Sequence, residues 1–204
     1  MKIAIIKYNA GNIQSVKFAL NRIGIEPVIT DSIEEVQLAD KVIFPGVGEA
    51  SSAMAYLKSK KLDKVIPNLK QPVLGICLGM QLMCRFSEEG NTDCIGIFDS
   101  IVKRFGSPFE WGQTRGQGDV KVPQIGWNSI YNLKGRLLKN INENEFQYFV
   151  HGYFVENSKY TIANTNYINE YSSALQKNNF YGVQFHPEKS SKAGEQLLKN
   201  FIEL

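Results

Sequence analysis

Short apolar runs alternate with helical patterns through the first half of the chain. The runs are rich in Val and Ile, helical periodicity at residues 12–23 and 52–60 falls between them, and they span residues 2–6, 27–30, 41–44 and 73–76. Strands joined by helices indicate a mostly parallel sheet with helices on both faces. We therefore predict an α/β fold whose functional groups gather beyond the carboxyl ends of the strands.

The second half of the chain has a different pattern. Strand-like runs follow one another with only turns between them, at residues 101–105, 128–131, 146–150, 160–165, 173–176 and 181–185. They predict an antiparallel extension, which makes the complete sheet mixed. Residues 192–203 have the pattern of an amphipathic closing helix. With no internal repeat or linker, we expect one domain over residues 1–204, with a long surface loop at residues 105–117.

Charge and cysteine content narrow the classes of function. The formal net charge is only +3 and the lysines are spread along the 204 residues, so we expect no nucleic-acid partner. No apolar run is long enough to span a bilayer, so we expect no membrane segment. Three cysteines without a C-x-x-C pair argue against a disulfide framework and a metal cage. We expect no metal ion, no cofactor and a reducing, cytoplasmic location.

The run Gly75-Ile76-Cys77-Leu78-Gly79, at the end of one predicted strand, is a candidate nucleophile elbow. A sharp strand-to-helix turn lifts its central side chain above the sheet edge, and the two glycines let the chain fold that tightly. At a helix N-terminus, the helix dipole and unpaired N–H groups favour a thiolate. The N–H group of Leu78 can then donate to an oxyanion. The alternative is a core cysteine between two turn glycines.

A cysteine nucleophile needs a base, and the chain has two histidines. His186 ends the run at residues 181–185 and precedes Pro187 and Glu188. In an extended chain, which Pro187 favours, His186 and Glu188 project to the same face, so the carboxylate can orient the imidazole. A turn histidine beside a solvated glutamate is the alternative. His151 has aromatic neighbours and no carboxylate nearby in sequence, which better suits a structural or pocket-lining role.

Backbone donors for an anion follow another predicted strand. Pro45-Gly46-Val47-Gly48 comes directly after residues 41–44 and is neither a G-x-G-x-x-G motif nor a P-loop. A phosphate cradle is therefore a weak interpretation. As the second half of an oxyanion hole the segment suits Cys77, because both leave the sheet at the same edge.

Three elements in combination resemble the class I, or triad-type, glutamine amidotransferases: residues 45–48, residues 75–81 and His186-Pro187-Glu188. The segments 123–128, 148–151 and 180–190 extend the likeness, in order and over nearly the whole chain, to members that supply ammonia to a synthase. The resemblance implies a flavodoxin-like fold: a mixed, mostly parallel central sheet flanked by helices, with an antiparallel extension.

The resemblance also implies roles for individual residues. By position, Cys77 attacks the carboxamide of L-glutamine, His186 transfers the proton and Glu188 orients His186. Backbone N–H groups of Val47 and Leu78 form the oxyanion hole, which in this family can require a peptide flip. The residues that match substrate-holding positions are Gly46, Gly48 and Gln81.

The implied partner is a HisF-type (β/α)8-barrel cyclase subunit, which forms a heterodimer with the glutaminase and receives ammonia for histidine biosynthesis. A dry channel between the two sites keeps ammonia unprotonated and so nucleophilic. The residues that match positions near the interface and the ammonia gate are Asn12, Gln124, Trp127, Tyr148 and Lys189.

The chain departs from the family pattern at three places. Gly152 stands where Ser or Thr is usual, Lys7 replaces an acidic residue, and the loop at residues 105–117 is long. Such changes leave open a paralogue that supplies ammonia for the amidation of a surface sugar. A cysteine peptidase or γ-glutamyl hydrolase is a further alternative, disfavoured by Gln81 and the Gly-Trp-Asn segment. A non-catalytic interaction module would need a broken triad.

Overall fold

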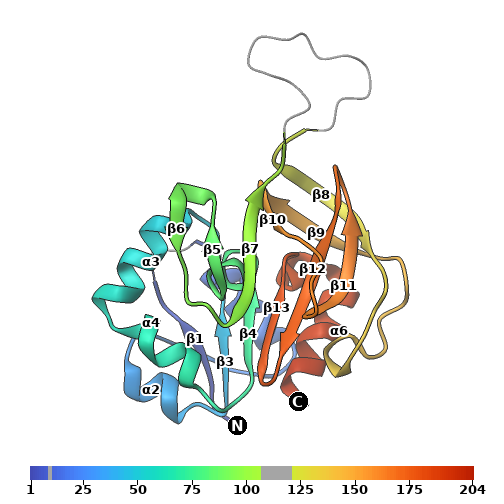
Figure 1. Cartoon of the computed structure of the whole chain (residues 1–204). Helices are drawn as coiled ribbons and strands as arrows, with labels where there is room; N and C mark the ends of the chain where they lie inside the picture. The colour runs from blue at the N-terminus through green and yellow to red at the C-terminus, as the bar shows by residue number, and fades with distance from the viewer. Residues whose placement is uncertain (9–10, 107–120) are drawn as a thin grey trace.

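A mixed sheet of eleven strands runs through the centre of the molecule (Figure 1). The structure is a computed structural model that describes residues 1–8, 11–106 and 121–204. Within these residues the strand order is β2-β1-β3-β4-β13-β12-β10-β7-β5-β6, and β11 pairs with β12. The strands are β1 (Ile3–Ile6), β2 (Val28–Thr30), β3 (Lys41–Phe44), β4 (Val73–Ile76), β5 (Cys84–Ser87), β6 (Thr92–Asp93), β7 (Phe98–Arg104), β10 (Tyr153–Val155), β11 (Thr161–Asn166), β12 (Glu170–Lys177) and β13 (Phe180–Val183).

The strands β2, β1, β3, β4 and β13 run parallel to one another. Every residue of β1, β3 and β4 is buried, because both faces of the sheet are covered. Ile3 and Ile5 pack into the core on one face, while Ala4 and Ile6 pack into the core on the other. Burial on both faces explains why these strands are continuous apolar runs. The predicted mixed α/β sheet is confirmed.

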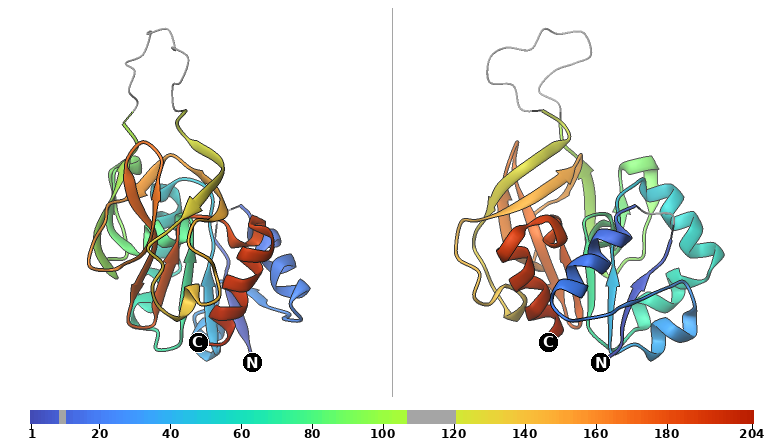
Figure 2. Two further views of the ribbon diagram at one scale, coloured as in Figure 1. Left: turned by 90° about the vertical axis from the view of Figure 1, so that its right-hand side faces the viewer. Right: turned by 180° about the vertical axis from the view of Figure 1, so that it is seen from behind.

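Two groups of helices form the outer layers. The helices α1 (Ile13–Arg22) and α6 (Ser191–Ile202) cover one face, where Figure 2 shows both. The other face is covered by α2 (Ile33–Leu38), α3 (Ala50–Ser59), α4 (Leu62–Val65) and α5 (Leu78–Leu82). The helices α1, α3 and α6 confirm the sequence predictions. The helices α2 and α4 were not predicted, because six and four residues are too few to show a helical period.

The antiparallel part of the sheet corrects two sequence predictions. The run at residues 181–185 falls on β13, which pairs in parallel with β4 and antiparallel with β12, so it is the junction between the two parts. Phe105, predicted to begin a surface loop, is buried against Phe154 and Tyr171. Its N–H group continues the strand pairing by donating to the Gly152 carbonyl. The rest of that predicted loop, residues 107–117, lies outside the described residues.

A separate two-stranded ribbon of β8 (Gln124–Ile130) and β9 (Glu145–His151) lies beside the main sheet. Because side chains alternate along a strand, one face of the ribbon is buried and the other is not. Gln124 and His151 point to the buried side, whereas Ile125, Trp127 and Phe146 are exposed. The ribbon therefore presents an apolar outer face.

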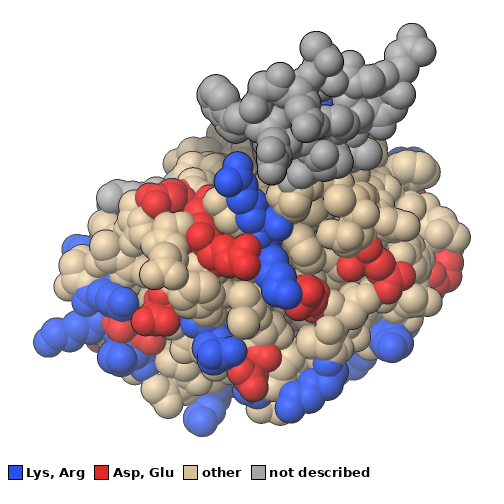
Figure 3. Space-filling view, turned by 45° about the horizontal axis from the view of Figure 1, so that its top comes forward, with Lys and Arg blue, Asp and Glu red and all other residues tan. Residues whose placement is uncertain are grey.

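Charged side chains of both signs are interspersed over the face in Figure 3. Exposed ion pairs include Arg85 with Asp99 (3.0 Å) and Lys103 with Glu156 (2.8 Å). Pairs at such solvent-exposed positions contribute about 1 kcal/mol or less to stability. No helix in the part of the chain that the structure describes is long and apolar enough to cross a membrane.

Candidate active site

Cys77 lies in a strained turn at the carboxyl end of β4. Its φ of 51° and ψ of −109° are unusual for a residue with a side chain, and such strain is typical of functional sites. The turn needs its glycines: a Cβ on Gly79 would lie 1.8 Å from the Phe44 carbonyl oxygen, and one on Gly75 would lie 2.4 Å from Met83 Cε. The local geometry is that of a nucleophile elbow.

His186 and Glu188 form a buried pair behind Cys77. The Nδ1 atom of His186 is 2.7 Å from Oε1 of Glu188, and both side chains are shielded from solvent. The pair forms by a different route from the predicted one. Pro187–Lys189 is a turn of 3-10 helix (η4), not an extended segment, because proline is also favoured in the first helical position. The turn brings the carboxylate back beneath the ring.

The charge state of His186 is set by its two neighbours. Burial disfavours the imidazolium, but the Cys77 thiolate and the Glu188 carboxylate outweigh it and raise the pKa of His186 to about 10. The helix α5 after Cys77 is only five residues long, so His186 is the stronger source of positive potential for the sulfur. Nε2 of His186 is buried and makes no hydrogen bond within the described residues. This arrangement can hold a thiolate–imidazolium pair.

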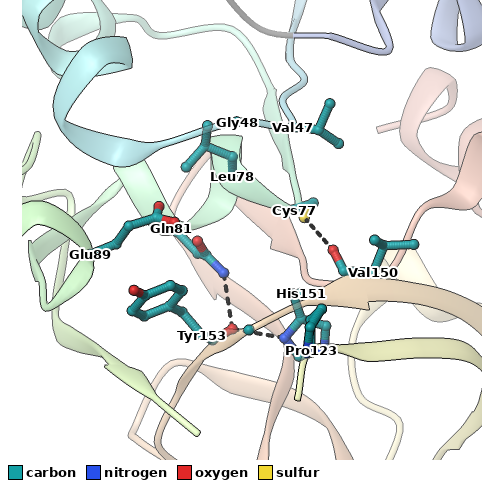
Figure 4. A pocket seen from close by; sticks show the side chains of 11 residues that line it. Val47, Gly48, Cys77, Leu78, Gln81, Glu89, Pro123, Val150, His151 and Tyr153 are labelled. Carbon is teal, nitrogen blue, oxygen red and sulfur yellow. Dashed lines mark hydrogen bonds between the residues drawn. The ribbon is translucent and has the colours of Figure 1, made fainter. Parts of the chain in front are cut away.

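A cavity of about 240 Å³ opens in front of Cys77 (Figure 4). This volume lies just below the size range of small-molecule sites, roughly 300–1,000 Å³, and suits a ligand no larger than an amino acid. Its lining residues are Val47, Gly48, Cys77, Leu78, Gln81, Glu89, Pro123, Val150, His151, Gly152 and Tyr153. Most of them come from the segments that follow β3 and β4 and from β9 and β10, while Glu89 comes from the 3-10 turn before β6 and Pro123 from the residue before β8. The predicted edge of the sheet is therefore where the cavity lies.

His151 is part of the cavity wall. Burial lowers its pKa to about 4, so the ring is neutral near pH 7. Its Nδ1 donates to the Tyr153 carbonyl (2.7 Å), and its Nε2 lies 3.1 Å from the Tyr171 hydroxyl. These contacts leave His151 no free nitrogen and agree with a pocket-lining role.

The backbone N–H groups predicted to form an oxyanion hole, those of Val47 and Leu78, are not both free to bind an anion in this structure. The Leu78 N–H group donates to the Gly46 carbonyl oxygen (3.2 Å), so this donor is occupied. The carbonyl of Val47 accepts from the Gly11 N–H group at 3.2 Å. The Tyr8 hydroxyl donates to the Pro45 carbonyl and lies so close to Gly46 that a Cβ there would be 1.9 Å from it. These contacts hold residues 45–47 in a conformation in which the Gly46 carbonyl occupies the Leu78 N–H group.

Comparison with known proteins identifies the family to which this chain belongs. The family profile of class I glutamine amidotransferases matches residues 5–204. The chain is a class I glutamine amidotransferase. Similar proteins include imidazole glycerol phosphate synthase subunit HisH of Bacteroides fragilis strain YCH46 (58% identity) and of Bacteroides thetaiotaomicron (54%), each aligned over the full length of both chains. These full-length relatives place the amidotransferase among the HisH subunits.

The fold agrees with solved structures. A Thermoplasma acidophilum protein assigned to GMP synthase superposes with a TM-score of 0.74 at 18% identity, covering all of this chain and 92% of that one. At that identity the likeness concerns the fold alone. No group of three or more metal-binding side chains is present in the described parts of the amidotransferase.

The residues matched to the partner interface fall into two sets. Trp127 and Tyr148 stack edge to face with ring centroids 5.8 Å apart, and Lys189 Nζ lies 6.0 Å from the Tyr148 ring, all on the outer side of the ribbon. Asn12 and Gln124 point inward instead. Asn12 donates to the Glu188 carboxylate, and buried Gln124 lies 2.9 Å from the Tyr171 hydroxyl. Asn12 thus contacts the His–Glu pair of the amidotransferase directly.

Sequence reasoning missed Glu89. This half-buried carboxylate lines the cavity, and its Oε2 accepts from the Ala50 N–H group (2.9 Å). Burial raises its pKa. Glu89 lies in a short 3-10 turn with no recognisable motif, so only the cavity identifies it. Among the departures from the family pattern, Gly152 lines the cavity, and a Cβ there would have ordinary contacts, at 3.8 Å or more.

Proposed function

We propose that this chain hydrolyses L-glutamine to glutamate and ammonia through a thioester on Cys77, as the glutaminase subunit of imidazole glycerol phosphate synthase. The observation that carries the proposal is the strained Cys77 at the cavity, backed by the buried His186–Glu188 pair. The names of the full-length relatives support the biosynthetic context. Three free cysteines suit a reducing cytoplasm.

The chemistry follows the usual logic of a Cys–His–Glu triad. The Cys77 thiolate attacks the carboxamide carbon of glutamine, forming a C–S bond and an oxyanion. His186 gives its proton to the leaving nitrogen, and ammonia departs as the C–N bond breaks. His186 then takes a proton from water, which attacks the thioester and releases glutamate. Glu188 stays ionised and keeps the imidazole oriented.

A flip of the Gly46–Val47 peptide would complete the oxyanion hole. In a trans peptide, C=O and N–H point in opposite directions. One rotation therefore removes the Gly46 carbonyl from the Leu78 N–H group and turns the Val47 N–H group toward the same point. Glycine at position 46 has the backbone freedom that this rotation needs. Gly48, with φ of 135°, gives the chain the same freedom after the rotated peptide.

Glu89 is proposed to bind the α-ammonium group of glutamine. We expect Glu89→Gln to raise the KM for glutamine by roughly 10–100-fold with little change in kcat, because it removes a charge–charge contact far from the reacting carbon. Steady-state glutaminase kinetics measure both constants. Glu88→Gln, at the exposed neighbouring carboxylate, is the matched control. A fall in kcat at unchanged KM would contradict this role.

The pH profile tests the role of Glu188. With the pKa of His186 near 10, wild-type kcat/KM should persist above neutral pH and fall as the imidazolium deprotonates near that value. Glu188→Gln removes an interaction that raises this pKa, so the alkaline limb should move down by roughly 1–3 pH units. Glu195→Gln, which changes an exposed carboxylate paired with Lys199, should leave the limb in place. An unmoved limb in Glu188→Gln would contradict the proposed triad.

The outer face of the ribbon is proposed to dock a HisF-type (β/α)8-barrel subunit. Ile125, Trp127 and Phe146 are 52–64% exposed there, and exposed apolar clusters rich in aromatics mark protein interfaces. The ribbon also reaches the site: Cys77 Sγ lies 3.7 Å from the Val150 carbonyl oxygen, and the backbone N–H group of His186 donates to the Tyr148 carbonyl (2.8 Å). A partner on this face would lie one strand away from the ammonia source.

The acceptor of the ammonia is tested by reconstitution. The purified chain is mixed with a histidine-pathway cyclase or with the cyclase-like subunit of a surface-sugar amidating system. We expect glutamine-dependent product formation with the first partner alone. Glutamine-dependent synthesis only with the second would replace the histidine assignment by the paralogue.

A further inference from the structure

Gln184 joins the glutamine cavity to the nucleophile. It follows β13, is fully buried, and lies between two residues of the site. Its Nε2 is 3.5 Å from Cys77 Sγ, and its Oε1 accepts from Gln81 Nε2 at 2.9 Å. Gln81 Nε2 also donates to the Tyr153 carbonyl at 3.1 Å. The result is a row of two amides that runs from a backbone carbonyl to the sulfur.

Only one orientation of this row satisfies all its hydrogen bonds. A backbone carbonyl can only accept, so the Gln81 atom facing Tyr153 must be the NH₂ group. The second hydrogen of that group then requires an oxygen from Gln184. The amide nitrogen of Gln184 is left facing Cys77, and reversing either amide would set two donors or two acceptors against each other. The fixed Tyr153 carbonyl thus aims an N–H donor at the sulfur.

We infer that Gln184 stabilises the thiolate of Cys77 by donating this N–H group, and that Gln81 acts as the positioning residue that keeps Gln184 in the donating orientation. The inference rests on the proposed function and adds Gln184 to the three residues of the proposed triad. Hydrogen bonds to an ionised acceptor are stronger than those to a neutral one, and this row is shielded from water. Gln81 therefore acts on the sulfur as well as lining the cavity.

The other titratable groups near Cys77 do not supply the same effect. His186, after the end of β13, provides positive charge, and Glu188 stabilises that charge. His151 is neutral near pH 7 and provides none. Tyr8 and Tyr171 also lie near the sulfur, and burial raises the pKa of each well above its usual value. Both phenols therefore stay neutral between pH 5 and about 10. Within that pH range neither phenol changes its charge, so the effect of removing the Gln184 donor can be measured without interference from them.

The test is the pH dependence of Cys77 alkylation by iodoacetamide in the full chain, read by mass spectrometry of the Cys77 peptide. Burial raises the pKa of Cys84 and of Cys94, so neither of these thiols competes for the reagent near neutral pH. Gln184→Met fills the same space without a donor. For Gln184→Met we expect the midpoint of the pH profile of Cys77 alkylation to lie roughly 1–2 pH units above that of the wild type. In glutaminase assays we expect this variant to show a lower kcat and an unchanged KM for glutamine. Gln184→Glu should shift the alkylation midpoint further, because a carboxylate repels the thiolate.

The matched control is Gln147→Met, which replaces another fully buried glutamine outside the row. We expect it to keep the wild-type midpoint. If Gln184→Met does not fold, Gln81→Met carries the test, since Gln184 then loses its orienting donor and the midpoint should rise. A wild-type midpoint in the folded Gln184→Met or Gln81→Met chain overturns the inference. Alkylation needs no glutamine, so failure of glutaminase activity in the wild type would overturn the proposed function separately.

Discussion

Replacement of Cys77 by alanine is expected to abolish glutamine-dependent synthesis while leaving ammonia-dependent synthesis by the partner intact. Without the sulfur no thioester can form, and removal of a triad nucleophile costs about 10³-fold or more in kcat. Ammonia supplied in solution bypasses the glutaminase step. The measurement compares product formation with glutamine and with ammonium salts at alkaline pH, in the reconstituted complex.

The control for this experiment is Cys94→Ala. Cys94 is half-buried and is not among the residues that line the cavity, so both rates should match the wild type. The thermal midpoint of Cys77→Ala should stay close to that of the wild type, because the lost sulfur is small and at the cavity edge. Equal losses of glutamine-dependent and ammonia-dependent rates would contradict the proposal, since they would indicate damage to the assembly.

The sequence alone predicts those parts of the site that are formed by residues close to one another along the chain. The glycines around Cys77 permit one tight turn, and a carboxylate two residues after His186 can reach its ring. The parallel strands were equally readable, because double burial makes each a continuous apolar run. In each case the decisive contacts lie within a few residues, or follow from a periodicity.

Long-range contacts could not be read in this way. Asn12 contacts Glu188 across 176 positions, and Gln184 contacts Cys77 across 107. Glu89 enters the cavity from a short 3-10 turn without a motif. In the sequence nothing distinguishes these residues from other polar side chains, because their contacts form only in the folded chain. The state of the oxyanion hole is also invisible in the sequence, because it depends on the rotation of a single peptide.

The second large prediction follows from the Leu78 N–H group, the proposed oxyanion donor that the Gly46 carbonyl occupies. Glutamine hydrolysis by the isolated chain should be slow and should rise by roughly 10²–10³-fold with the HisF-type partner and its nucleotide ligand. The Gly46 carbonyl occupies the Leu78 N–H group, and loss of one oxyanion donor costs about 10²–10³ in kcat. Binding on the ribbon can favour the flipped peptide only if the partner binds that state more tightly. Glutamate release under saturating glutamine measures the stimulation.

Two variants distinguish docking from activation. Trp127→Ala removes an exposed aromatic of the ribbon and should raise the partner concentration needed for half-maximal stimulation by about 10-fold or more, with the same plateau. Leu38→Ala, an exposed apolar residue on α2 away from the ribbon, should change neither quantity. A glutaminase rate that is the same with and without partner and ligand would contradict the closed-hole account. The Gly46 carbonyl would then not limit the reaction, and the hole would have to form as readily in the free protein.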